Sequence, residues 1–356
     1  SKDLDFAWLT PGGVRNPVEN YNSLPDGLAT FTDSYPGGWQ EVFPNGGLPS
    51  TALGASFGQH GEVCTLPWDY SVRDDTDQLV SVDFSVRTMK TPFRIVKNLS
   101  LAANSTTLNL SETITNLSAQ RLDTMWGQHL AWGRPFIDES TIIRVPKGVK
   151  LIAHNAGGDD SNRRIKTDRP LTWPISEGID GQPVDLSKIP PKDTNCEMLY
   201  FTELSEGWYE VESLDKGVGV RVEWDLAVMP YLWYWHEFGG TRGYPWYGDM
   251  YNIGLEPFSS LPTSGLAGAI ENGSTCVFEP NQARDFNLAA SGTQVLVTWS
   301  GGGSYRPVVY GQLLTTSGLA GGTITIDDNG LASDNPIAIA SDGTDFLVVF
   351  PDEVGP

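Results

Sequence analysis

Glu256 is the first residue whose surroundings favour acid–base chemistry. It lies in the stretch Gly254-Leu-Glu-Pro-Phe258, where apolar neighbours limit the solvation of its carboxylate. Loss of solvation raises a carboxyl pKa toward neutrality, which suits the group to general base work. The following proline also predicts a turn, and a glutamate beside a proline is more often a solvated turn residue. The stretch therefore nominates Glu256 as a candidate base that needs partners elsewhere in the chain.

Two of the four histidines supply such partners. His60 lies between glycines in Phe57-Gly-Gln-His-Gly61, and His129 lies among tryptophans in Met125-Trp-Gly-Gln-His-Leu-Ala-Trp132. Flanking glycines let a backbone approach a ligand closely. Either histidine alone is more often structural than catalytic. Together with Glu256 they provide the groups for paired acid and base catalysis on a neutral substrate.

The elements that position these residues are predicted to be strands. Among 356 residues there are 39 Gly and 24 Pro, and short β-branched and aromatic runs lie between them. Apolar and polar residues alternate over 80–87, 106–115 and 218–224, as in half-buried strands, and no segment keeps a helical period. We therefore expect an all-β chain of packed antiparallel sheets.

Charge and cysteine usage exclude several classes of function. A net charge of −21 argues against partners such as nucleic acid and against anionic membranes, which would repel the protein. Cys64, Cys196 and Cys276 are widely spaced, so we expect no disulfide, no metal and no cofactor. The chain shows no apolar run long enough to cross a bilayer and no signal peptide. An extracellular or periplasmic location is slightly favoured over a cytoplasmic one.

Three regions break the strand pattern. Residues 1–60 are rich in Gly and Pro and are expected to lie across a sheet without a ladder of their own, contributing loops to a cleft. Residues 155–195 form a polar excursion. The stretch 287–299 is echoed by 338–350, a period of 51 residues that resembles the repeats of secreted β-propeller-like proteins. We expect a β-sandwich domain over 1–288 and a β-repeat extension over 289–356.

Six motifs, taken in order, resemble the aldose 1-epimerase (galactose mutarotase-like) family over about residues 3–288. They are Gly37-Gly-Trp-Gln-Glu-Val-Phe-Pro-Asn-Gly-Gly47, His60-Gly-Glu-Val63 with Leu66-Pro-Trp-Asp69, Trp126-Gly-Gln-His129, Gly207-Trp-Tyr209, Pro230-Tyr-Leu-Trp-Tyr-Trp235 and Gly254-Leu-Glu-Pro257. The resemblance implies a large twisted antiparallel β-sandwich with a sugar cleft. It also implies that N-terminal strands of the sandwich are missing, which would leave an exposed sheet edge. Copies of the chain could associate through this edge or through the C-terminal repeat.

The resemblance implies a role for each candidate catalytic residue. Glu256 corresponds to the general base, His129 to the general acid, and His60 to the histidine that helps to hold the sugar. Gln128 stands where relatives often have a second histidine, and the arginine that many mutarotases place upstream of His60 has no clear counterpart. These departures concern the identity of the substrate more than the type of reaction.

The implied activity is the interconversion of α and β anomers of a hexose such as galactose. Residues expected to contact the sugar offer aromatic faces or hydrogen-bonding groups: Gln40, Trp126, Gln128, Asp225, Trp233, Trp235 and Trp246. Few basic residues lie near the motifs, so a neutral monosaccharide or glycan terminus is expected. The alternative is a non-catalytic extracellular protein that uses the same scaffold for carbohydrate binding or assembly.

Overall fold

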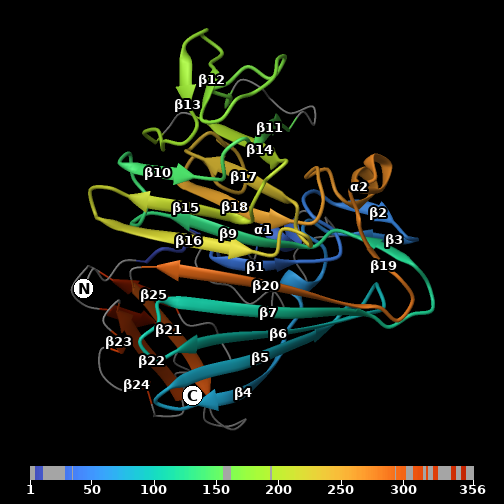
Figure 1. Cartoon of the computed structure of the whole chain (residues 1–356), viewed down its shortest axis with the longest axis vertical. Coiled ribbons are helices and arrows are strands. Elements are labelled where there is room, and N and C mark those ends of the chain that lie inside the picture. Colours follow the sequence, from blue (N-terminus) through green and yellow to red (C-terminus); the bar gives the residue numbers. More distant parts are fainter. Residues whose placement is uncertain are drawn as a thin grey trace, which may run out of the picture.

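The computed structural model describes residues 5–10, 29–33, 35–154, 162–192 and 195–292. Beyond these it describes the backbone of the strands between 294 and 349. Two large antiparallel sheets dominate the chain (Figure 1), as the alternating patterns predicted.

The first sheet has six strands in the order β1-β9-β18-β17-β14-β11. In that order their bounds are Trp39–Val42, Gly127–Gly133, Asn252–Phe258, Tyr231–Glu237, Cys196–Thr202 and Lys150–Ala153.

The second sheet has eight strands in the order β10-β15-β16-β20-β7-β6-β5-β4. In that order their bounds are Thr141–Arg144, Trp208–Ser213, Val218–Trp224, Ala283–Gly292, Thr107–Asn116, Phe93–Ala102, Leu79–Arg87 and Asp69–Asp75. Because β20 continues to Gly292, the expected domain boundary at residue 288 falls inside a paired strand.

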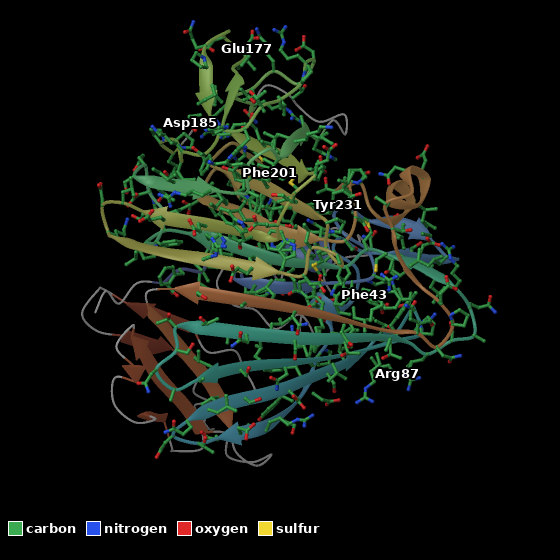
Figure 2. All side chains as sticks on the ribbon, in the orientation of Figure 1. Phe43, Arg87, Glu177, Asp185, Phe201 and Tyr231 are labelled. Carbon is green, nitrogen blue, oxygen red and sulfur yellow. The ribbon has the colours of Figure 1, made fainter. Side chains whose placement is uncertain are left out.

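Small elements complete the described chain. Three two-stranded pairs are β2 (Ser50–Ala52) with β3 (Ala55–Phe57), β8 (Leu122–Thr124) with β19 (Cys276–Phe278), and β12 (Ile175–Glu177) with β13 (Pro183–Asp185). The β12–β13 hairpin belongs to the polar excursion and projects from the sandwich, where Glu177 and Asp185 mark it in Figure 2. The helical elements are α1 (Ala29–Thr32), η1 (Val63–Thr65) and α2 (Leu266–Asn272). None of the described helices has the length and apolarity needed to span a bilayer.

The C-terminal strands are described by their backbone. They are β21 (Gln294–Gly301), β22 (Val308–Thr315), β23 (Gly318–Leu319), β24 (Ile324–Asp327), β25 (Ala338–Ser341) and β26 (Phe346–Val349). β25 and β26 pair with each other. The side chains of the 338–350 echo lie outside the described residues, so the repeat stays a prediction.

Two local expectations were wrong. Residues 1–60 do supply part of a ladder, since β1 pairs with β9 along its whole length. Glu256 is not in a turn but within β18, a central strand that accommodates Pro257. Asn252 to Gly254 and Phe258 pair with β9, and the register skips residues 255–257, so the ladder itself is interrupted where the proline lies.

The hydrophobic core fills the space between the two large sheets. Trp126 from the β8–β9 junction packs against Phe286 of the eight-stranded sheet, with ring centroids 5.5 Å apart. Each strand of the six-stranded sheet therefore has an inner face toward the core and an opposite face, called here the pocket face. Successive residues alternate between these two faces.

Candidate active site

One row of side chains crosses the pocket face of the six-stranded sheet. In the backbone pairing, Tyr200 of β14 lies opposite Trp233 of β17, and Trp233 lies opposite Glu256 of β18. On the next strand His129 lies opposite Gln40 of β1. The row closes where His129 Nε2 comes within 3.4 Å of Glu256 Oε1. Two groups that are 127 residues apart in sequence thus become neighbours because their strands are adjacent.

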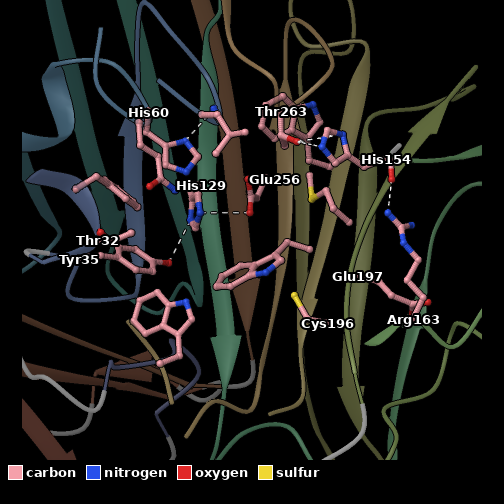
Figure 3. Close-up of a pocket in the computed structure, with 18 residues that line it drawn as sticks. Thr32, Tyr35, His60, His129, His154, Arg163, Cys196, Glu197, Glu256 and Thr263 are labelled. Carbon is pink, nitrogen blue, oxygen red and sulfur yellow. Dashed lines mark hydrogen bonds and ion pairs between the residues drawn. The ribbon is translucent and has the colours of Figure 1, made fainter. Parts of the chain in front are cut away.

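A pocket of about 360 Å³ lies over this row (Figure 3). The three predicted catalytic residues, His60, His129 and Glu256, all line it. Their exposed fractions are only 6%, 4% and 2%. The volume falls within the range of small-molecule sites. The pocket therefore brings together three titratable groups in a largely water-excluded space.

His60 reaches the pocket from a loop with an unusual backbone. Its φ of 58° lies in the left-handed region, which non-glycine residues seldom adopt. The Gly47 N–H donates to His60 Nδ1 over 3.3 Å. The imidazole rings of His60 and His129 meet edge to face with centroids 5.0 Å apart. The hydrogen bond from Gly47 and the ring contact with His129 keep His60 in this strained backbone conformation, next to β9.

Burial controls the protonation of all three groups. It raises the pKa of Glu256 well above the usual carboxyl value and lowers the pKa of His129 to about 4. Burial also lowers the pKa of His60 well below its ordinary value, and repulsion from His129 adds to this when both rings are protonated. Burial therefore favours the uncharged form of each partner in the 3.4 Å contact: a carboxyl group that keeps its proton and an imidazole that does not take a second one.

Three of the predicted sugar-contacting residues line the pocket: Trp233, Trp235 and Trp246. The Trp235 ring lies 5.9 Å from that of His129, centroid to centroid. Trp233 is fully buried and stacks on Phe258 at 3.6 Å, so it forms part of the pocket floor. Trp235 and Trp246 are partly exposed.

The other four predicted sugar-contacting residues do not line this pocket. Trp126 and Gln128 lie on the inner face, where their side-chain N–H groups donate to Glu41. Gln40 donates to the Gly37 carbonyl. Asp225 lies just after β16, in the other sheet, where it accepts the Ala227 N–H. Trp126 and Gln128 do not reach the pocket because their side chains point to the opposite face of the sheet from that of His129.

Gln128 instead belongs to a buried polar network behind the site. Its amide donates to the carboxylates of Glu41 and Glu112 at 2.9 Å each. Lys97 lies 3.6 Å from Glu41. Burial and the neighbouring Glu41 charge raise the pKa of Glu112 well above its ordinary value. This network ties β1 and β9 to β7 of the facing sheet.

Sequence reasoning missed the aromatic wall over the catalytic pair. Phe31 and Tyr35 line the pocket, and the Phe31 ring packs on His60 with centroids 4.5 Å apart. The Tyr35 hydroxyl lies 3.2 Å from His129 Nδ1. The aromatic character of these two residues was the available signal, but residues 1–60 hold several other aromatic residues from which the sequence does not distinguish them.

A second polar cluster lies on the other side of Glu256 in Figure 3. The Tyr200 hydroxyl is 2.7 Å from His154 Nδ1 and 2.8 Å from Thr263 Oγ1. Arg163 donates to the His154 carbonyl. His154, Arg163 and Thr263 all line the pocket, so it has polar groups at both ends.

Comparison with known proteins identifies the fold. No family model and no curated protein matches the sequence. Among solved structures, a candidate aldose 1-epimerase from Klebsiella pneumoniae aligns with a TM-score of 0.63 and 17% identity, over 82% of this chain and 72% of that chain. Slr1438 from Synechocystis sp. aligns with a TM-score of 0.52 and 18% identity, over 81% and 84% of the two chains. YeaD from Salmonella typhimurium, a candidate mutarotase, aligns with a TM-score of 0.50 and 12% identity, over 81% and 79%.

At these sequence identities the structural similarity supports the fold only. The order and pairing of strands in the two large sheets are those of a twisted antiparallel sandwich. The chain has the β-sandwich fold of the galactose mutarotase-like proteins.

Proposed function

We propose that the protein interconverts the α and β anomers of a hexose by acid–base ring opening. The observation that carries this proposal is the 3.4 Å approach of His129 Nε2 to Glu256 Oε1 in a pocket that His60 also lines. An acid and a base side by side can act on the two oxygens bonded to one anomeric carbon. Each positioned group typically contributes about 10²- to 10⁴-fold to the rate.

The reaction needs one exchangeable proton on the pair, held by either partner. In ring opening, one partner takes the proton of the anomeric hydroxyl while the other gives a proton to the ring oxygen. The bond between the anomeric carbon and the ring oxygen breaks, its electrons pass to the ring oxygen, and the aldehyde forms. Rotation about the first carbon–carbon bond and reclosure, with the partners exchanging roles, yields the other anomer.

The protonation of the resting site bears on which partner acts first. In the uncharged state that burial favours, the carboxyl group of Glu256 is the acid of the first step and the imidazole of His129 is its base. This reverses, for the free protein, the roles that the family resemblance implies. Transfer of the proton to His129 in the bound complex would restore them. Both arrangements contain the same number of protons, and each cycle passes through both.

The pocket walls suit a pyranose ring. Partly exposed Trp235 and Trp246 present flat apolar faces to C–H groups, whereas His60 provides a ring nitrogen for a hydroxyl or the ring oxygen. Such a mixture of aromatic walls and a few polar groups is typical of small-molecule sites.

Anomer exchange measured by NMR tests the proposal. Freshly dissolved α-galactose or α-glucose should equilibrate faster with the protein than in buffer alone. Glu256→Gln should remove the acceleration, because an amide neither gives nor takes the proton. Glu203→Gln is a matched control, since that carboxylate is 60% exposed and pairs with Lys150 outside the pocket. Sugar binding without acceleration in the unaltered protein would instead support the alternative, carbohydrate binding without turnover.

A further inference from the structure

Tyr35 makes a contact that acid–base catalysis by His129 and Glu256 leaves unexplained. Its hydroxyl oxygen lies 3.2 Å from His129 Nδ1, and both side chains are buried. His129 Nε2, the other ring nitrogen, faces Glu256. The imidazole is therefore held between a phenol on one side and a carboxyl group on the other.

Packing fixes the position of the Tyr35 hydroxyl. The Tyr35 ring stacks on Phe31 with centroids 4.9 Å apart, and Trp8 lies 5.6 Å away. Trp246 meets it edge to face at 6.3 Å. Rotation of a phenol about its axis leaves the oxygen in place, so these aromatic neighbours set the distance to His129.

The titratable groups that face His129 in the described residues are Tyr35, His60 and Glu256. Burial, together with the charge of Glu256, raises the pKa of Tyr35 well above its ordinary value. Tyr35 thus stays a neutral phenol, whose oxygen keeps lone pairs that accept a hydrogen bond.

A neutral imidazole carries its proton on one of two nitrogens, and a hydrogen bond to one nitrogen decides the state of the other. For His129 to exchange a proton with Glu256 and the sugar, Nε2 must be the nitrogen that gains and loses it. Nδ1 must then keep its own proton throughout, which requires an acceptor beside it.

We propose that Tyr35 is a positioning residue: its hydroxyl oxygen accepts the Nδ1–H of His129 and so keeps Nε2 as the nitrogen that exchanges the proton. The kinetic part of this inference rests on the proposed function, whereas the tautomer itself does not.

The variant Tyr35→Phe removes the acceptor and keeps the ring. We expect kcat for anomer exchange to fall about 10- to 100-fold with KM within about two-fold, because the sugar still binds but His129 loses its reactive tautomer. Tyr234→Phe is the matched control. That tyrosine is also fully buried, and its hydroxyl donates to the Leu186 carbonyl from the inner face, away from His129.

Nitrogen-15 NMR of the histidine side chains reads the tautomer directly. In the unaltered protein at neutral pH, His129 should show an unprotonated Nε2 and a protonated Nδ1, with the signals assigned by their loss in His129→Asn. In Tyr35→Phe the Nε2 signal should move toward the protonated position, and in Tyr234→Phe it should not.

Two results would overturn the inference: a protonated Nε2 in the neutral ring of the unaltered protein, or an unchanged His129 spectrum and kcat in Tyr35→Phe. If the unaltered protein does not accelerate anomer exchange, the proposed function fails, but the spectrum still decides the tautomer. The spectrum of the unaltered protein also decides it if Tyr35→Phe does not fold.

Discussion

Gly254 and Glu256 lie on the same face of β18, and the carboxylate of Glu256 folds back over the glycine. A Cβ atom at position 254 would lie 2.3 Å from Glu256 Oε1. Residues two apart in a strand share a face, so only a residue without a side chain leaves room for this carboxylate position. The glycine is needed here for space beside the His129–Glu256 pair.

Gly254→Ala should therefore reduce catalysis while the protein remains folded. The added methyl group meets Glu256 Oε1 at 2.3 Å and the Trp235 ring at 3.2 Å, so the carboxylate must move away from His129. We expect at least a roughly 10-fold loss of anomer-exchange rate, since misplaced catalytic groups lose rate steeply. Gly243→Ala is the control, because nothing lies within 4 Å of its added Cβ. Full activity in Gly254→Ala would contradict the role given to the position of Glu256.

The rate of anomer exchange should depend on pH through the His129–Glu256 pair. Below about pH 4 the imidazole of His129 becomes protonated, so the pair holds two protons and has no base. As the pH rises through the raised pKa of Glu256, the pair loses its shared proton and has no acid. The expected profile of kcat/KM is a plateau that spans neutrality, measured after subtraction of the buffer rate at each pH. An acid limb near the ordinary imidazole pKa of about 6.5 would show that burial does not control His129.

Strand alternation made part of this architecture readable from the sequence. The patterns at 80–87 and 218–224 correspond to β5 and β16. Buried and more exposed residues alternate in β16, whereas in β5 the two buried residues, Ser81 and Val86, lie on opposite faces. In β9 and β18 every residue is buried, so their sequence shows no alternation. Without alternation, the sequence does not indicate which face of the sheet each side chain occupies. For this reason Trp126 and Gln128 were assigned to the sugar site, although they lie on the inner face.

The three candidate catalytic residues were nominated by their local surroundings, and the ordered resemblance of motifs then implied a role for each of them. Tyr35 could not be found in this way, because its contact with His129 joins residues 94 apart through the tertiary fold. His154 was not placed in the site, since its contacts with Tyr200 and Thr263 join residues that are far apart in sequence.

Glu112→Gln should stabilise the fold at alkaline pH. The folded protein keeps a proton on Glu112 at pH values where the unfolded chain releases it, so stability falls as the pH rises through the raised pKa. An amide cannot ionise, and it can still bond to Glu41 and Gln128. We expect a gain of about 1–3 kcal/mol in the free energy of unfolding at pH 8 and a smaller gain at pH 5, measured by urea denaturation. Glu279→Gln, at a 60% exposed side chain, is the control. Equal effects at both pH values would contradict a protonated Glu112.

Glu197→Gln should have the opposite effect on stability. The Glu197 carboxylate accepts hydrogen bonds from the backbone N–H groups of Arg164 and Ile165, and His236 Nε2 lies 2.8 Å away. Although burial opposes ionisation, the hydrogen bond from His236 and the charge of Arg164 lower the pKa of Glu197 to about 2. Its contribution is present above the ordinary carboxyl pKa and is lost as the pH falls toward 2.

Breaking one side of such a buried charged cluster typically costs about 3–5 kcal/mol. Urea denaturation at pH 7 should show a loss of this size in Glu197→Gln. Glu203→Gln, at an exposed ion pair, should change the unfolding free energy by about 1 kcal/mol or less. A comparable small change in both variants would mean that Glu197 does not anchor the excursion that contains Arg164.

The row of side chains across the pocket face forms only if the strands of the six-stranded sheet pair in the correct register. Successive side chains in a strand point to opposite faces. A one-residue slip of β18 against its neighbours would therefore turn Leu255 toward the pocket face. The same slip would turn Glu256 toward the interior, where Glu41 and Glu112 lie. Misaligned sheets are thus penalised by a further buried carboxyl group beside Glu41 and Glu112, as well as by lost packing. The proposed anomer exchange would then report whether the strands of this sheet are paired in the correct register.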